Sequence, residues 1–356
     1  MRHTLPAILW LATLTCVAQD ITTLQTKAAA GDPAAQFELG MTFHDGKGVP
    51  ANDLKSAEWV RKAADQGYAP AENELGVMYR LGEGVERDKA EAVRWFHLAA
   101  QHGSAKAMYN LGAAFYNGDG VAIDDAASLR WFLLSQAFGD DKAADAVARG
   151  EQDLNAGPKE EAYFQAGETL ASGALGKQDT AGAARYYEKA AQLGYSPAQV
   201  RLAIAYLDGR GVPQNDELAT HWSEAAFKAK SAWAAFLLGY MYHQGRGKKQ
   251  DIGDAIKWYK KASDGGISAA MINLGVIYSR PEGVKQDYVA ADYWFGLADR
   301  LHDPKGAKGR GVVETHLTPD QVAKNQKKLD DWIVHHGFTA PVLRNTTRVS
   351  EKNLHR

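Results

Sequence analysis

A spacing of 36 residues governs most of the chain. A Leu-Gly pair stands at Leu39 and Gly40, and matching pairs return 36 and 72 residues later. A second series with the same step begins 55 residues beyond Gly112, which leaves 19 residues in excess of one period. The sequence therefore contains seven repeats, in blocks of three and four, with an insertion between the blocks. The seven pairs are Leu39-Gly40, Leu75-Gly76, Leu111-Gly112, Ala166-Gly167, Leu202-Ala203, Leu238-Gly239 and Leu274-Gly275.

Each repeat has the pattern of two helices separated by a glycine turn. In the first repeat, Ala35, Leu39 and Phe43 share one face of a helix with Gly40. A glycine inside a helix costs about 1 kcal/mol relative to alanine, so its recurrence indicates close approach of a partner helix. Asn or Asp stands twelve residues after each central position and predicts the N-cap of a second helix. These caps are Asn52, Asp88, Asp124, Asp179, Asn215, Asp251 and Asp287.

Large apolar side chains recur in the same way. A ring or leucine stands three residues after each central position, and a tryptophan or tyrosine stands nineteen residues after it. A single helix pair cannot bury such a face alone, whereas stacked pairs bury it against one another. The sequence therefore predicts an all-α solenoid of about seven helix-turn-helix repeats with terminal capping helices.

The segments outside the repeats have predicted roles of their own. The apolar run Leu5–Leu14 is too short to span a bilayer, and small residues ending at Ala18 follow it, as in a cleavable signal peptide. A lipid anchor on Cys16 and a buried N-terminal helix are alternatives. A joint that is helical over 142–154 and broken at 155–158 is expected between the blocks. The predicted segments are a signal peptide (1–18), an N-terminal cap with repeats one to three (19–139), an irregular helical joint (140–161), repeats four to seven (162–302), a C-terminal capping helix (303–342) and a disordered tail (343–356).

Composition and charge exclude several classes of protein. The 41 Lys and Arg residues nearly balance the 43 Asp and Glu residues, so no basic field is available to attract nucleic acid. One cysteine in 356 residues excludes a disulfide scaffold and a cysteine-rich metal site. We expect no integral membrane segment once the signal peptide is removed.

No catalytic motif is recognisable. Five turns contain Gly-x-Gly, but they follow helices rather than strands, unlike phosphate-binding loops. The histidines lack a zinc-ligand spacing, and Asp88 or Asp124 is better explained as an N-cap than as a general acid. We therefore expect no catalytic residue, no cofactor and no metal, and predict that the protein is not an enzyme.

The residues 35–40, 46–49 and 57–64 resemble the Sel-one-like repeat, a relative of the tetratricopeptide repeat. The pattern recurs at 71–103, 107–139, 198–226, 234–266 and 270–298, and more weakly at 162–194. The resemblance implies a right-handed α/α superhelix whose first helices line a concave surface. It also implies an adaptor that holds protein partners, and many bacterial members are exported. A cysteine-rich branch is linked to β-lactam binding, but this chain would have no cysteine after signal cleavage.

By this resemblance, the positions three before, one after and four after the central glycine point into the concave groove. Many of them are apolar or aromatic, and large exposed apolar strips mark binding surfaces. The alternative is that neighbouring first helices bury these residues. The predicted partner-binding residues are Phe37, His44, Arg80, Tyr109, Tyr116, Phe164, Phe236, Tyr240 and His243.

These observations favour an exported scaffold, periplasmic or secreted, that binds a partner protein or peptide. Two other functions remain open. One is binding of a small molecule or cell-wall peptide, for which the joint at 140–161 is the only plausible pocket. The other is a purely structural role in an envelope assembly.

Overall fold

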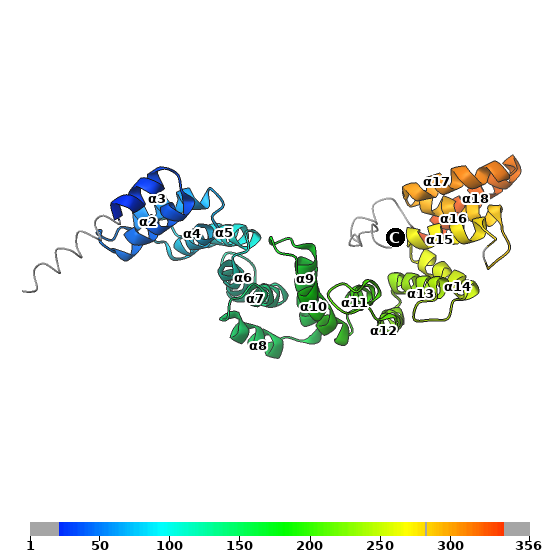
Figure 1. Ribbon diagram of the computed structural model, residues 1–356, viewed down its shortest axis with the longest axis horizontal. Coiled ribbons are helices and arrows are strands. Elements are labelled where there is room, and N and C mark those ends of the chain that lie inside the picture. The colour runs from blue at the N-terminus through cyan, green and yellow to red at the C-terminus, as the bar shows by residue number, and fades with distance from the viewer. Residues whose placement is uncertain (1–20, 282, 338–356) are drawn as a thin grey trace, which may run out of the picture. The chain divides into compact units, whose positions relative to one another are not determined.

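The computed structural model describes residues 21–281 and 283–337, and every regular element within them is helical (Figure 1). The predicted signal peptide with Cys16 and the predicted tail at 343–356 lie outside these residues. The chain divides into two compact units, Met1–Leu193 and Gly194–Arg356. The prediction of an all-α chain of seven helix-turn-helix repeats with capping helices is confirmed for the described residues.

The first unit contains four repeats and the insertion. Residues 21–29 form a helix that caps the first repeat, and Gln36 Nε2 donates a hydrogen bond to the Ala28 carbonyl at 3.1 Å. The repeats and the insertion are α2 (Pro33–Asp45) with α3 (Asp53–Ala64), α4 (Ala69–Leu81) with α5 (Lys89–Gln101), α6 (Ala105–Asn117) with α7 (Asp125–Ala137), α8 (Ala143–Asp153), and α9 (Ala156–Ser172) with α10 (Thr180–Gln192).

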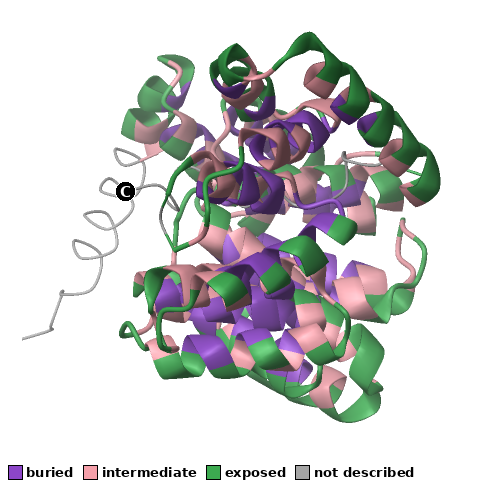
Figure 2. Ribbon diagram, turned by 90° about the vertical axis from the view of Figure 1, so that its right-hand side faces the viewer, coloured by how far each residue is buried: buried purple, intermediate pink, exposed green. Residues whose placement is uncertain are grey.

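The second unit contains three repeats and a C-terminal cap. Its helices are α11 (Ser196–Asp208) with α12 (Asp216–Lys228), α13 (Ala232–Gln244) with α14 (Ile252–Asp264), α15 (Ser268–Ser279) with α16 (Tyr288–Arg300), then α17 (Pro304–Val313), the 3-10 turn η1 (Glu314–His316) and α18 (Pro319–His336). Figure 2 shows buried residues along the facing sides of the helices and mostly exposed residues in the connecting turns.

The predicted N-caps are confirmed in all seven repeats. Asn52 accepts from the backbone N–H of Lys55, and the Asn or Asp at the corresponding position of every other repeat accepts from the first turn of its helix. The first helices of six repeats end at a glycine with positive φ, as a left-handed C-cap requires. These caps thus fix where the first helix of a repeat ends and where its second helix begins.

The central glycine is required by a large side chain on the second helix, which is a ring in five of the six repeats that have this glycine and Val60 in the first. A Cβ added at Gly239 would lie 2.6 Å from the Tyr259 ring, and one at Gly112 would lie 2.7 Å from Phe132. In repeat five the glycine is replaced by Ala203, and the residue twenty positions later is the small Ser223 instead of a ring. The seven facing residues are Val60, Phe96, Phe132, Tyr187, Ser223, Tyr259 and Phe295. The expected close approach of the two helices is confirmed by these distances.

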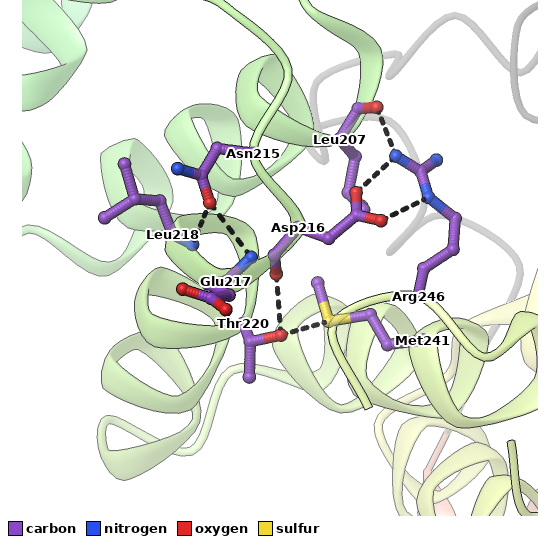
Figure 3. Close-up of polar contacts among 8 residues, drawn as sticks. All are labelled: Leu207, Asn215, Asp216, Glu217, Leu218, Thr220, Met241 and Arg246. Carbon is purple, nitrogen blue, oxygen red and sulfur yellow. Dashed lines mark hydrogen bonds and ion pairs between the residues drawn. The ribbon is translucent and has the colours of Figure 1, made fainter. Parts of the chain in front are cut away.

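The second glycine of the turn lets adjacent repeats approach. A Cβ added at Gly247 would lie 2.4 Å from the Asp216 carbonyl oxygen, and one at Gly120 would lie 2.2 Å from that of Lys89. An ion pair stands beside each contact. Arg246 donates to both carboxylate oxygens of Asp216, at 2.5 and 3.1 Å, and to the Leu207 carbonyl at 2.7 Å (Figure 3). The hydrogen bond to Asp216 raises the pKa of the Arg246 guanidinium.

The same pair occurs with exchanged charges in the first unit. Lys89 occupies the position of Asp216, Asp119 that of Arg246, and their charged atoms lie 2.5 Å apart. We therefore expect Arg246→Asp to destabilise the second unit by about 1 kcal/mol. The exchange Asp216→Lys with Arg246→Asp should recover at least half of this loss, measured by urea denaturation. Equal destabilisation by the single and double variants would contradict a stabilising ion pair between positions 216 and 246.

A buried polar cluster holds the C-terminal cap to the last repeat. Asp292 on α16 is fully buried, and Arg310 Nε on α17 lies 3.1 Å from its Oδ1. Asn325 Nδ2 on α18 donates to the other carboxylate oxygen of Asp292 at 2.8 Å. A capping box of Thr318 with Gln321 starts α18. One carboxylate thus connects the three elements that close the second unit.

The insertion differs in detail from the expectation. The helical part was predicted over 142–154, and α8 covers most of it. The break is confined to Leu154 and Asn155, since α9 begins at Ala156 and includes Gly157 and Pro158. Pro158 stands in the first turn of α9, where its missing N–H would have no helical partner in any case. The predicted break is therefore present at Asn155, but its predicted extent over residues 156–158 was wrong.

Candidate binding site between α6, α7 and α8

The structure keeps seven of the nine predicted binding residues at least partly accessible. Tyr116 is the most exposed, at 57%. The other six are half-buried: Phe37, His44, Arg80, Tyr109, Tyr240 and His243. They belong to first helices, as expected.

Phe164 and Phe236 are buried, with 6% and 3% exposure, so the expectation that they line an open groove is corrected. Both stand three residues before the central glycine. The ring that packs on that glycine also contacts this position, with centroids 6.0 Å apart for Phe164 and Tyr187 and 5.8 Å apart for Phe236 and Tyr259. These two side chains therefore belong to the core between the paired helices.

Tyr109 and Tyr116 meet at a pocket of about 470 Å³ in the first unit. Its walls come from the first helix α6, the second helix α7 and the inserted helix α8. The buried Phe132 forms part of the floor, with its ring centroid 5.2 Å from that of Tyr109. Residues that characterise the pocket are Tyr109, Tyr116, Asp125, Phe132, Arg149 and Asp153.

Packing and polar contacts keep α8 in place as a wall of this pocket. A Cβ at Gly150 would lie 3.0 Å from the Leu129 side chain, so α8 runs close to α7 at that point. Glu151, at the far side of α8, pairs with Lys189 of α10 at 2.8 Å and accepts from the Tyr163 hydroxyl of α9 at 2.5 Å. These contacts lower the pKa of Glu151, against the opposing effect of its desolvation. These contacts hold α8 against its neighbouring helices, and with it one wall of the pocket.

The second unit carries a smaller candidate surface. Tyr240 and His243 lie on α13, and a pocket of about 430 Å³ includes His243, Ile252 and Val276. His243 Nδ1 lies 3.4 Å from the hydroxyl of buried Tyr259, whose pKa is raised by burial. Because this pocket has fewer aromatic residues, the site in the first unit is the stronger candidate.

Sequence reasoning named the joint at 140–161 for a pocket but did not show that α8 packs against α7 to form one, and it missed the ring column that faces most of the central glycines. The pocket itself lies where the sequence left room for one, at the joint between the two blocks. Within the described residues, no cluster of three or more His, Cys, Asp or Glu side chains is arranged to bind a metal ion. No helix in this part of the chain is long and apolar enough to cross a membrane.

Comparison with known families places the repeats in a defined class. The family model described as Sel1 repeat matches residues 33–68, 69–104, 105–135, 160–195, 196–231, 234–267 and 268–298. These matches cover more than half of the chain. The prediction made from the repeat motif is thereby confirmed.

Two solved structures illustrate the similarity. The Sel1 repeat protein from Oxalobacter formigenes is 26% identical over 89% of this chain and 89% of that chain, with a TM-score of 0.45. The protein c5321, a protective antigen of uropathogenic Escherichia coli strains with an SLR fold, is 28% identical over 90% of this chain and 80% of that chain, with a TM-score of 0.37. A comparison with curated proteins gave no significant match.

Proposed function

Because the chain belongs to the Sel1 repeat family, we propose that it is a non-enzymatic scaffold that binds a segment of a partner protein. Family members are generally scaffolds for protein interactions. The observation that carries the proposal is the pocket between α6, α7 and α8, where the 57%-exposed Tyr116 lies beside a buried apolar floor. Exposed tyrosines next to preformed pockets are typical anchors of protein interfaces.

The proposed location is outside the cytoplasm, in the periplasm or the surrounding medium. The support comes from the sequence at 1–18, where a short apolar run is followed by small residues ending at Ala18. Mass spectrometry of the mature N-terminus in the native host tests this part, and an uncleaved chain would contradict it.

Tyr116→Ala is the direct test of the binding surface. We expect it to weaken binding of the partner about tenfold or more, because truncation of an interface tyrosine commonly costs 1–2 kcal/mol. The measurement is titration calorimetry with the protein that copurifies with the full chain. Leu54→Ala is the matched control, since Leu54 is 69% exposed on the second helix α3, away from the pocket lining. Equal affinities of the Tyr116 variant and the unaltered chain would refute the proposal.

Small-molecule binding is the second candidate, and the size of the pocket favours it specifically. A volume of about 470 Å³ lies within the range of about 300–1,000 Å³ that small-molecule sites occupy. The test is thermal unfolding of the chain with isolated amino acids or short cell-wall peptides added. A rise in the unfolding temperature that is lost in Tyr116→Ala would favour small-molecule binding over the scaffold. If the chain binds such a small molecule and no protein copurifies with it, small-molecule binding would replace the scaffold as the proposed function.

A further inference from the structure

Negative charge is concentrated around the pocket between α6, α7 and α8. Residues 117–155, which include α7 and α8, contain eight acidic and three basic side chains, a formal net charge of −5, while the whole chain has only −2. The rest of the chain is therefore slightly positive. Asp119 and Glu151 are paired with Lys89 and Lys189 from outside this stretch, which leaves a net charge of −3. A partner segment that binds in this pocket meets a negative field, and complementary charge steers and orients binding.

Two carboxylates of the pocket lining are available to a ligand. Asp125 begins α7 and Asp153 ends α8. Within residues 21–281 and 283–337, neither side chain forms an ion pair. The carbonyl end of α8 adds to the negative potential at Asp153, which favours a cation at that place. Arg149 also lines the pocket, and its Nε donates to the Asp145 carbonyl at 3.4 Å.

The remaining lining suits the aliphatic part of a long basic side chain. Tyr109 and Tyr116 present aromatic rings, and Leu129 and Phe132 supply an apolar floor. Lysine and arginine bury their methylene stems against apolar surface and place their charge beside carboxylates or over rings. We propose that this pocket binds a lysine or arginine side chain of the partner segment. This inference rests on the proposed function, because it specifies the ligand of the same site.

The test compares pools of fluorescent seven-residue peptides that have neutral mixed flanks and differ only at the central residue. The central residues are Lys, Arg, norleucine and Glu, and fluorescence anisotropy with the full chain gives the affinities. We expect the Lys and Arg pools to bind about tenfold more tightly than norleucine, as an aromatic and ionic contact of ordinary strength implies. Asp125→Asn with Asp153→Asn should abolish this preference and leave the binding of the norleucine pool unchanged.

Two further variants separate local recognition from bulk charge. Asp141→Asn with Asp145→Asn removes the same charge from exposed positions outside the pocket lining and should keep most of the preference. Arg149→Gln removes a competing cation and should tighten the Lys pool about two- to threefold. Binding of all pools without preference, or preference for Glu, would overturn this inference alone. If no pool bound at all, both the inference and the proposed peptide-binding function would be contradicted.

Discussion

Asp292→Ala is expected to destabilise the C-terminal cap by about 2 kcal/mol, because it removes the buried partner of Arg310 and leaves that arginine only the part-exposed Glu314 at 2.7 Å and the more distant Asp299. The carboxylate is fully buried, and the side chain of Arg310 is only 15% exposed. Asn325 loses an acceptor in the same step. Hydrogen exchange should show α17 and α18 opening first, while α11 to α14 keep their protection.

Asp299→Ala is the matched control for this prediction. Asp299 also faces Arg310, but at 3.8 Å and with 37% of its side chain exposed. Its removal should cost less than about 1 kcal/mol, as is usual for partly exposed pairs. Similar losses from the two variants would mean that the buried cluster does not hold the cap.

Gly239→Ala is expected to destabilise the second unit by about 2 kcal/mol, although alanine is the better helix former. The added Cβ would lie 2.6 Å from the Tyr259 ring, and Tyr259 is fully buried and cannot move away freely. The midpoint of urea denaturation, followed by circular dichroism, measures the effect.

Repeat five provides the control for this substitution. At Ala203 the facing residue is Ser223, so there is no ring for the methyl group to meet. Ala203→Gly should therefore also destabilise, by about 1 kcal/mol, through lost helix propensity. If Gly239→Ala instead raised the urea midpoint, the Tyr259 ring would not be the reason why glycine recurs at the central position of the repeats.

The sequence was sufficient for the parts of the fold that depend on local chemistry. Each N-cap was predicted from an Asn or Asp at a fixed distance from the central position of the repeat. Asp124 and Asn215, for example, both form the expected hydrogen bonds. The capping box at Thr318 was equally recognisable. Such features need only neighbouring residues, so one sequence with a clear period determines them.

Features that depend on contacts between helices were harder to predict. Phe236 was placed on an open surface because the repeat resemblance implies that its helical position faces the concave groove, whereas its burial depends on how Tyr259 packs across the helix pair. The other repeats contain no helix that corresponds to α8, so the packing of α8 against α7 at Gly150 could not be derived from the 36-residue period. The pocket follows from that packing and was anticipated only in its location.

Site-specific photocrosslinking is the most direct test of whether a partner protein binds at Tyr116. A photoreactive amino acid is introduced at position 116 in one strain and at the exposed position 54 in another, and adducts are identified by mass spectrometry. We expect one dominant protein adduct from position 116, which is lost when Tyr109→Ala is added, and none of that adduct from position 54. The same adduct from both positions, or none from position 116, would contradict binding at Tyr116.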